Sequence, residues 1–255
     1  MLCIRLRAVR SKKVRISGAY FFGVFMRLIK KFFLYFSKFE LTLWLSSLAL
    51  IILSFVIFDR ENYFSFVSSL IGATALIFCA KGNPFGQVLI IIFGLLYGII
   101  SFSFRYYGEM ITYVGMTVPM AILSLVTWLK NPYKGNRAEV KVNKIKKKEL
   151  VLLFFLALAV TFSFYFILKY FNTANLIVST VSVATSFIAA FLTMRRSPFF
   201  ALAYAVNDVV LIVLWIMATI VDISYLSVII CFSVFLFNDL YGFFNWLRMR
   251  NRQKT

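Results

Sequence analysis

Eight long apolar segments constrain the fold of this sequence more than any other feature. Each has 18–23 residues, the length of helix needed to cross ~30 Å of hydrocarbon at about 1.5 Å per residue. The segments cover residues 41–58, 63–80, 85–104, 110–128, 150–170, 177–194, 199–221 and 225–246. With 62% hydrophobic and 15% charged residues, the chain is more apolar than a soluble domain. It is therefore predicted to be an all-α polytopic membrane protein.

The positive charge is distributed unevenly between the segments. If the N-terminus is cytoplasmic, 25 of the 28 Lys and Arg residues fall on the cytoplasmic side. Basic loops are retained in the cytoplasm during insertion, so both termini are expected there, in a multi-pass plasma-membrane protein. The net charge of +19 then reflects topology and contact with the lipid bilayer. No nucleic-acid partner is expected.

Residues 1–40 hold ten of these basic residues and a single acid. No apolar core of about 7–15 residues with a cleavage site follows, so no signal peptide is expected. The second half, AYFFGVFMRLIKKFFLYFSKF, mixes aromatic and basic residues and predicts an interfacial helix on anionic lipid. A poorly ordered leader and a misplaced start codon are the alternatives.

Residues 63–128 and 177–246 repeat the same arrangement of three apolar segments. Each copy has a proline shortly after a basic residue, at Pro84 and Pro198, and ends in a tryptophan, Trp128 or Trp246. One segment, at 150–170, separates the copies, which gives both copies the same orientation. The predicted layout is therefore 3+1+3, and parallel repeats place a substrate near the midplane at their interface.

The remaining parts of the chain lie outside this repeat. They are an extra N-terminal transmembrane helix at 41–58, a basic cytoplasmic loop at 129–149 and a basic cytoplasmic tail at 247–255.

The sequence has little of the chemistry that catalysis needs. It contains no histidine, and its three cysteines show no metal-ligand spacing. Cys79 and Cys231 lie in apolar segments and are interpreted as small packing residues. Because no nucleophile–base pair or metal cluster is recognisable, the protein is expected to be neither an enzyme nor a metal or cofactor protein.

Two Asn-Asp dipeptides interrupt the last two apolar segments, Asn207-Asp208 and Asn238-Asp239. A carboxylate inside a membrane costs roughly 2.5–3.5 kcal/mol on insertion scales, so such residues usually serve a polar purpose. Helical spacing puts Asn207 and Trp215 on one face. It also puts Asn238 and Tyr241 on one face of the last segment.

The first repeat contributes Gln87 and Tyr97 from a shared helix face. Asn and Gln both donate and accept hydrogen bonds, which suits a carboxamide or ribose hydroxyls. Tyr and Trp rings attract a cation by roughly 0.5–2 kcal/mol, and a carboxylate could offset its charge. A small ligand with a flat cationic ring fits this set.

Other interpretations of these residues remain open. The two asparagines could bridge helices, and the two aspartates could lie in a solvated mouth. Trp128 and Trp246 precede basic segments and are expected in the interfacial aromatic belt. Gly94 and Gly98 form a GxxxG pair, which favours helix packing.

Four stretches resemble the PnuC-type vitamin transporters, a family whose best-known class carries nicotinamide riboside. They are GQVLIIIFGLLYGIISFSFRYYGEM, the basic loop with EVKVNKI, AYAVNDVVLIVLW and NDLYGFFNWLRMRNR. They span about residues 63–250. The resemblance implies a SWEET-like core, a homotrimer, and energy-independent uptake with trapping by cytoplasmic phosphorylation.

The family motif is roughly WxxWxxxN. Asn207 matches its asparagine, but Phe200 and Ala203 stand at the tryptophan positions. The aromatic platform is therefore expected from Tyr204 or Trp215.

The predicted function is facilitated transport of nicotinamide riboside, a precursor of NAD. Asn207, Asn238 and Gln87 are expected to hold its amide and hydroxyl groups, and Asp208 to stabilise its positive ring. The alternatives are thiamine or riboflavin on the same fold, and a binding subunit of an ATP-driven importer. The complete set of candidate substrate-binding residues is Gln87, Tyr97, Tyr204, Asn207, Asp208, Trp215, Asn238, Asp239 and Tyr241.

Overall fold

The computed structural model describes residues 34–103, 107–220 and 222–254. This part of the chain contains eight helices that are long and apolar enough to cross a membrane. Six are continuous: α2 Lys38–Phe58, α3 Tyr63–Ala80, α4 Phe85–Ser103, α7 Lys147–Tyr170, α8 Leu176–Met194 and α9 Phe199–Thr219. Two are composite, with α5 Tyr107–Ile111, a π-helix Thr112–Thr117 and α6 Val118–Leu129 in one, and a 3-10 turn Ile223–Tyr225 and α10 Leu226–Arg252 in the other. The predicted fold class is confirmed.

The chain forms two compact units, Met1–Leu45 and Ser46–Thr255. In the first unit, the backbone N–H of Ser37 donates to the Glu40 carboxylate at 2.7 Å. The N–H of Glu40 donates back to Ser37 Oγ at 3.2 Å, a capping box that satisfies two otherwise unpaired N–H groups and starts α2. The interfacial helix predicted before this point lies almost wholly outside the described residues.

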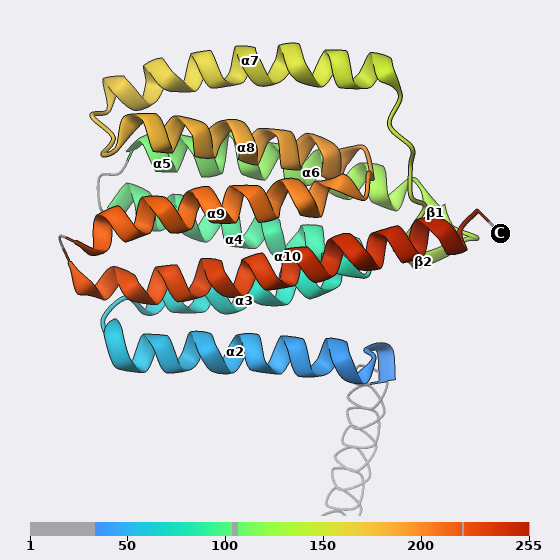
Figure 1. Cartoon of the computed structure of the whole chain (residues 1–255), viewed down its shortest axis with the longest axis horizontal. Helices are drawn as coiled ribbons and strands as arrows, with labels where there is room; N and C mark the ends of the chain where they lie inside the picture. The colour runs from blue at the N-terminus through green and yellow to red at the C-terminus, as the bar shows by residue number, and fades with distance from the viewer. Residues whose placement is uncertain (1–33, 104–106, 221, 255) are drawn as a thin grey trace, which may run out of the picture. The chain divides into compact units, whose positions relative to one another are not determined.

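Six helices of the second unit form a closed ring. Around it, α3 packs on α4, α4 on α6, α6 on α8, α8 on α9, α9 on α10, and α10 returns to α3 (Figure 1). The predicted first bundle supplies α3, α4 and α6, and the second supplies α8, α9 and α10. Helix α7 packs outside the ring on α8, and its phenylalanines Phe154, Phe155, Phe162 and Phe166 are exposed. Such an apolar exposed surface is what a lipid-facing helix requires.

The second bundle caps the first at the end of α3. The Trp246 indole N–H donates to the Cys79 carbonyl at 2.8 Å, and Asn245 Nδ2 donates to the Ala80 carbonyl at 2.9 Å. The last carbonyls of a helix have no partner within it, so these side chains satisfy groups that lipid could not.

The first bundle caps the second in the same way at the end of α8. Trp128 Nε1 donates to the Thr193 carbonyl at 2.9 Å, and Thr127 Oγ1 donates to the Met194 carbonyl at 3.0 Å. Each tryptophan and the residue before it therefore cap two successive carbonyls of the opposite bundle. The predicted repeat thus has a two-fold relation in three dimensions.

The tryptophan prediction itself was wrong. Trp128 and Trp246 are 1% and 0% exposed, so they lie in the core and not in an interfacial belt. Tryptophans of an interfacial belt are also followed by basic segments. The neighbouring sequence therefore does not distinguish a buried tryptophan from a belt tryptophan.

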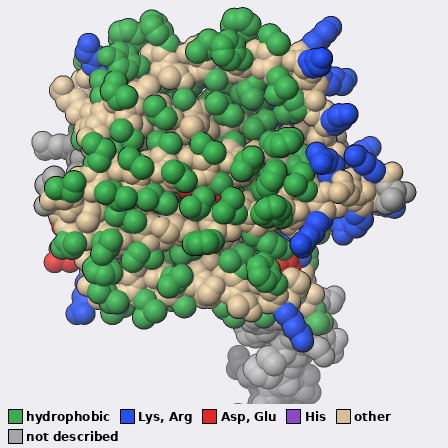
Figure 2. All heavy atoms as spheres, in the orientation of Figure 1, with side chains coloured by type: hydrophobic (Ala, Val, Ile, Leu, Met, Phe, Trp, Pro, Cys, Tyr) green, Lys and Arg blue, Asp and Glu red, His purple; other side chains and the backbone are tan. Residues whose placement is uncertain are grey.

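The basic loop is more ordered than the sequence predicted. It contains a hairpin of β1 Pro132–Tyr133 and β2 Asn136–Val140. Lys134 and Gly135 connect the strands with φ of 48° and 80°, as expected when both central residues of a two-residue turn are left-handed. Residues 131–143 are called the strap below. Lys and Arg side chains gather around it, and this end of the molecule is called the basic end (Figure 2).

The strap binds equivalent points of the two bundles. The N–H of Val140 donates to the Gly82 carbonyl at 2.9 Å, and the N–H of Asn143 donates to the Arg196 carbonyl at 2.9 Å. Gly82 and Arg196 each lie two residues before the repeat proline, and both are left-handed, with φ of 66° and 56°. The backbone of the strap therefore joins the two halves through matching turns.

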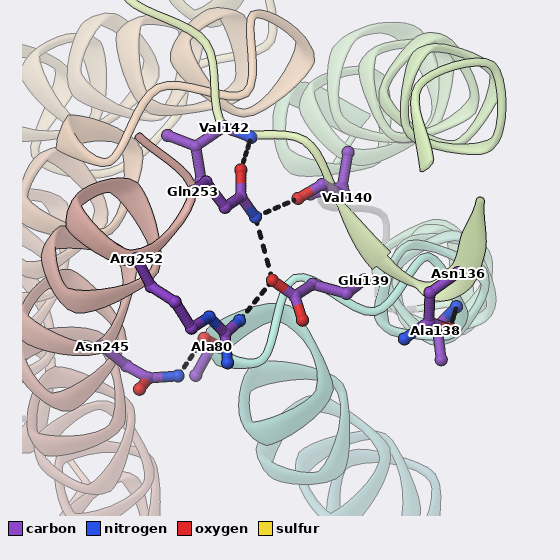
Figure 3. Close-up of polar contacts among 9 residues, drawn as sticks. All are labelled: Ala80, Asn136, Ala138, Glu139, Val140, Val142, Asn245, Arg252 and Gln253. Atoms are coloured by element: carbon purple, nitrogen blue, oxygen red, sulfur yellow. Dashed lines mark hydrogen bonds and ion pairs between the residues drawn. The ribbon is translucent and has the colours of Figure 1, made fainter. Parts of the chain in front are cut away.

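The strap also holds the end of α10, as Figure 3 shows. The N–H of Val142 donates to Gln253 Oε1 at 2.7 Å. Gln253 Nε2 donates to Glu139 Oε1 at 2.9 Å and to the Val140 carbonyl at 3.1 Å, and Arg252 pairs with Glu139. The side-chain amide of Gln253 thus accepts one hydrogen bond from the strap and donates two to it.

On the α8–α9 turn, Arg196 donates to the Lys141 carbonyl at 3.2 Å, and Asn143 Nδ2 donates to the Arg195 carbonyl at 3.1 Å. Burial, and secondly the charge of Arg195, lowers the pKa of Arg196. A guanidinium nonetheless remains charged in proteins, so it stays a donor to the strap.

Candidate functional site

A cavity of about 500 Å³ lies between the two bundles, inside the helix ring. Its walls include residues of α3, α4, the π-helix, α8, α9 and α10. It reaches Asp59, Asn62, Thr173 and Asp222 at the end of the bundle opposite the strap, called the loop end below. The cavity therefore occupies the repeat interface predicted from sequence.

The first bundle supplies an aromatic wall. The ring centroids of Phe93 and Tyr97 are 4.7 Å apart, and those of Tyr97 and Tyr113 are 5.0 Å apart. Phe235, from the second bundle, joins this group at 6.3 Å from Phe93. Such a group offers aromatic surface for a ligand to pack on, and its two tyrosines add hydroxyls for hydrogen bonds.

Glycines of α4 allow this wall to form. A Cβ at Gly94 would lie 2.8 Å from Val118 Cγ2, and one at Gly98 would lie 2.4 Å from Val114 Cγ2. Both distances are below van der Waals contact, so the GxxxG pair permits close helix packing, as one interpretation of the sequence held. The π-helix adds Thr112, Tyr113, Met116 and Thr117 to the cavity wall, and single π-turns often occur at functional sites.

The second bundle supplies a polar wall centred on Asn207. Its Oδ1 accepts from Thr185 Oγ1 at 2.7 Å, from Ser186 Oγ at 3.0 Å and from Ser182 Oγ at 3.5 Å. These hydroxyls of α8 fix the amide with its oxygen turned toward α8. Asn207 is 5% exposed and lines the cavity, so its Nδ2 hydrogens are the part available to a ligand.

Asp208 and Asp239 lie together in the cavity wall. Both side chains are buried, with 4% and 5% of their surface exposed. Asp208 Oδ2 is buried without a hydrogen-bond partner among the described residues. The solvated-mouth interpretation is therefore excluded for both, because neither side chain is exposed.

Three further acids line the cavity nearer the loop end: Asp59, Glu109 and Asp222. Together with Asp208 and Asp239 they make five carboxyl groups, and no Lys or Arg occurs among the described residues of the wall. The electrostatic field in the cavity thus favours a cation.

Tyr97, Tyr204, Asn207, Asp208, Trp215 and Asp239 are the candidate residues that the structure brings together in the cavity wall. Trp215 packs on Tyr225 with ring centroids 5.2 Å apart. Tyr204 meets the edge of Phe200, at 6.4 Å. Both aromatic candidates of the second bundle therefore have a cavity-facing position.

Gln87, Asn238 and Tyr241 do not line the cavity. Asn238 Nδ2 donates to Ser47 Oγ at 2.9 Å and to the Val234 carbonyl at 2.8 Å, so it bridges α10 to α2. Gln87 Nε2 lies 3.3 Å from Cys79 Sγ, between α4 and α3. The helix-bridging interpretation, made for the two asparagines, describes Asn238, and Gln87 also finds its partner on a neighbouring helix.

An aromatic cluster lies between the cavity and the strap. The centroids of Trp128 and Trp246 are 5.3 Å apart, and Phe200 lies 4.9 Å from Trp246 and 6.3 Å from Trp128. All three side chains are buried. Phe200, which occupies the first tryptophan position of the family motif, therefore belongs to this cluster.

Sequence reasoning missed several residues of the wall. Ser179, Ser182 and Ser186 are spaced at three and four along α8, a polar stripe that helical periodicity could have revealed. Tyr113 and Glu109 carried no signal, because a single tyrosine or acid near the end of a span is commonplace at a membrane interface.

Comparisons with known proteins agree with this geometry. Residues 62–248 match the family model described as nicotinamide mononucleotide transporter. A protein of Neisseria mucosa, named nicotinamide riboside transporter PnuC, is 24% identical over 200 residues, which are 77% of this chain and 76% of that protein. The crystal structure of the vitamin B3 transporter PnuC matches 86% of this chain and 94% of its own, with a TM-score of 0.72 and 24% identity. The resemblance found in the sequence is confirmed, and the chain belongs to the nicotinamide mononucleotide transporter family of membrane proteins.

Proposed function

We propose that this protein transports nicotinamide riboside across the membrane. The observation that carries the proposal is the composition of the cavity wall, with an aromatic side, an amide donor, and five carboxyl groups with no described Lys or Arg. Nicotinamide riboside combines a cationic aromatic ring with a carboxamide and ribose hydroxyls. Cations over aromatic faces and beside carboxylates are stabilised in such a site.

The same wall argues for the riboside over the mononucleotide. A phosphate would enter a buried space with five acids and without a basic partner, and a buried unpaired charge is strongly unfavourable. The family description names the mononucleotide, whereas the Neisseria mucosa relative is named for the riboside. The charge of the wall supports the riboside for this chain.

Each wall then has a role in binding. Asn207 donates its Nδ2 hydrogens to the carboxamide oxygen or to a ribose hydroxyl. Tyr97 and Tyr113 from the first bundle, with Trp215 from the second, stack on the ring. Asp208 faces the positive charge.

The orientation follows from charge. The strap, the turns at 81–84 and 195–198, and the end of α10 carry the basic residues and are assigned to the cytoplasm. The cavity then opens outward at the loop end, and the aromatic cluster of Phe200, Trp128 and Trp246 closes it inward. Alternate opening moves the substrate by facilitated diffusion in the plasma membrane, with cytoplasmic phosphorylation trapping it, and the protein assembles as a homotrimer.

Thiamine is the second candidate, since it is also a flat cation and meets the same acidic wall. Riboflavin carries no positive charge and gains nothing from that wall. Binding of nicotinamide riboside, its mononucleotide, thiamine and riboflavin therefore distinguishes the candidate substrates.

A binding titration of the purified protein against nicotinamide riboside, its mononucleotide, thiamine and riboflavin tests the proposal. The riboside is expected to bind at micromolar concentration, and the mononucleotide and riboflavin far more weakly. The substitution Asn207→Leu should weaken binding of the riboside. The substitution Asn251→Leu, at an exposed position, should leave binding unchanged. If thiamine binds more tightly than the riboside, thiamine becomes the proposed substrate. If the riboside does not bind, the proposal is overturned.

Uptake by protein-containing liposomes tests the transport step. Labelled riboside is expected to equilibrate across the membrane without added nucleotide. A strict requirement for ATP and a second protein would favour an importer subunit instead.

A further inference from the structure

The strap is fixed to the first bundle by its covalent connection and by backbone contacts. It follows α6 directly, and the N–H of Asn131 donates to the Trp128 carbonyl at 3.1 Å. Asn131 Nδ2 donates to the Thr127 carbonyl at 2.8 Å. At the other end of the hairpin, Val140 bonds the Gly82 carbonyl and its side chain is 0% exposed. Because exposing a buried side chain and two anchored ends is costly, the strap and the first bundle form one unit.

The contacts of the strap with the second bundle are polar. Gln253 and Arg252 hold it from the end of α10 (Figure 3). Asn143 donates its N–H to the Arg196 carbonyl, and the Arg196 side chain donates to the Lys141 carbonyl. The Arg252 side chain is 59% exposed, so water can reach this side of the strap. Water replaces the lost partner of such a bond, so breaking one costs only about 0.5–1.5 kcal/mol.

The strap covers the aromatic cluster that closes the cavity at the basic end. Val140 belongs to one hydrophobic cluster with Trp128, Phe200, Trp246 and Met249. The glycine of the α3–α4 turn allows this packing, because a Cβ there would lie 2.7 Å from the Met249 Cε and 3.3 Å from the Val140 Cγ1. The strap spans both bundles outside this cluster. A route from the cavity to the basic end between the bundles therefore requires that the strap part from one of them.

We propose that the strap is a latch, which moves with the first bundle and releases the second bundle whenever the cavity opens at the basic end. The released contacts are those with the turn at 195–198 and with the end of α10. This inference rests on the proposed function, because it requires a cavity that opens at its two ends in turn. The contacts that water can replace break, whereas those with α6 and the α3–α4 turn persist. The stretch EVKVNKI, residues 139–145, then serves the latch and not the substrate site.

Reversible cross-linking of the strap to the second bundle tests the latch in the full-length protein. Asn143→Cys/Arg196→Cys places two thiols at positions joined by a backbone bond of 2.9 Å, which a short disulfide-forming linker can bridge. Cys79 and Cys231 are buried, and Cys3→Ser removes the remaining thiol. Uptake of labelled nicotinamide riboside into liposomes should fall to background after linking and recover after reduction. Its binding should stay within about twofold, because the cavity is unchanged.

The matched control links two positions that the latch carries together. The N–H of Lys141 donates to the Asn131 carbonyl at 2.8 Å, so Asn131→Cys/Lys141→Cys presents a similar pair within the strap. Linking this pair should leave uptake unchanged. Continued uptake when Asn143→Cys/Arg196→Cys is fully linked would overturn the latch. An equal loss of uptake in the control would overturn it too, because the hold on the second bundle would then not be the cause.

A second measurement reports release of the latch without any substrate. Met249 is 5% exposed and lies in the cluster beneath the strap, so the thiol introduced by Met249→Cys should react slowly with a soluble thiol reagent. Gln253→Ala removes three hydrogen bonds to the strap and should make this labelling about tenfold faster. Asn251→Ala, at an exposed position of the same helix, should not change the rate. Equal rates in all three proteins would contradict the latch.

The outcomes distinguish this inference from the proposed function. Uptake of the riboside by the protein linked at 143 and 196 refutes the latch and leaves the transporter assignment intact. If the native protein takes up no riboside but Gln253→Ala speeds the labelling, the substrate is refuted and the latch is retained.

Discussion

The two three-helix bundles share one scaffold but line the cavity with different chemistry. At the basic end they are matched: each ends in a tryptophan that caps the other, and each presents a left-handed turn to the strap. Around the cavity they diverge: the grouped rings of Phe93, Tyr97 and Tyr113 belong to the first bundle, whereas the Asn207 amide and the buried Asp208 and Asp239 belong to the second. Contacts that hold the halves together have thus kept their symmetry, while the contacts available to a ligand have not.

The largest expected effect comes from breaking the matched scaffold. Trp128→Ala and Trp246→Ala each remove a fully buried ring and leave a carbonyl unpaired, so each should lower the free energy of unfolding by about 3–5 kcal/mol. Because the two sites are equivalent, the losses should agree within about 1 kcal/mol. Denaturation in detergent measures both. The Trp→Phe variants keep most of the packing and should lose far less, and a large inequality between the alanine variants would contradict the symmetry.

The next effect concerns the polar wall of the second bundle. The double variant Asp208→Asn/Asp239→Asn removes both carboxylates near the ligand ring while keeping size. Nicotinamide riboside should bind about 100-fold more weakly, a loss of roughly 2.7 kcal/mol. A neutral analogue with a reduced ring serves as the matched ligand and should be affected little. Equal losses for both ligands would show that the acids act on folding and not on charge.

A smaller effect is expected at the aromatic wall of the first bundle. Tyr97→Leu removes a stacking surface, and the loss of roughly 0.5–2 kcal/mol predicts about 2- to 30-fold weaker binding of the cation. Tyr97→Phe retains the ring and should bind nearly as well as the native protein. If the phenylalanine variant fails as badly as leucine, the hydroxyl and not the ring is what the ligand uses.

The smallest effect on binding should come from the amides outside the cavity. Asn238→Ala breaks the bridge from α10 to Ser47, which should cost about 0.6–2 kcal/mol of stability. Substrate affinity should stay within about twofold, an effect below 0.5 kcal/mol. Thermal unfolding and a binding titration on one preparation test both parts. A tenfold loss of affinity with unchanged stability would return Asn238 to the site.

Hydropathy predicts the transmembrane segments because the thickness of the bilayer sets their length and each segment ends where the chain meets water. The position of Asn207 was also predictable, since a polar residue in the middle of a span needs a reason. Helical spacing, however, gives only the face on which a residue lies. It could not say that α2 stands opposite Asn238 or that α3 stands opposite Gln87, so these amides were placed in the site.

The tryptophans and the strap show a second limit. Trp128 lies next to basic residues in the sequence, as a belt tryptophan does. It is buried only because the opposite three-helix bundle packs against it. The hairpin formed by residues 132–140 is too short for its pattern to stand out within a basic loop. In both cases the deciding partner is more than 50 residues away, beyond the reach of any local pattern.

The strap has a consequence for the order in which the protein is assembled. It is made before α7 and the second bundle, yet its partners include the Arg196 carbonyl and the Gln253 amide. During synthesis the strap can therefore bond only the turn of the first bundle, until the second bundle has been made. The strap completes these contacts only once α10 has emerged from the ribosome, so its closure follows the synthesis of both bundles.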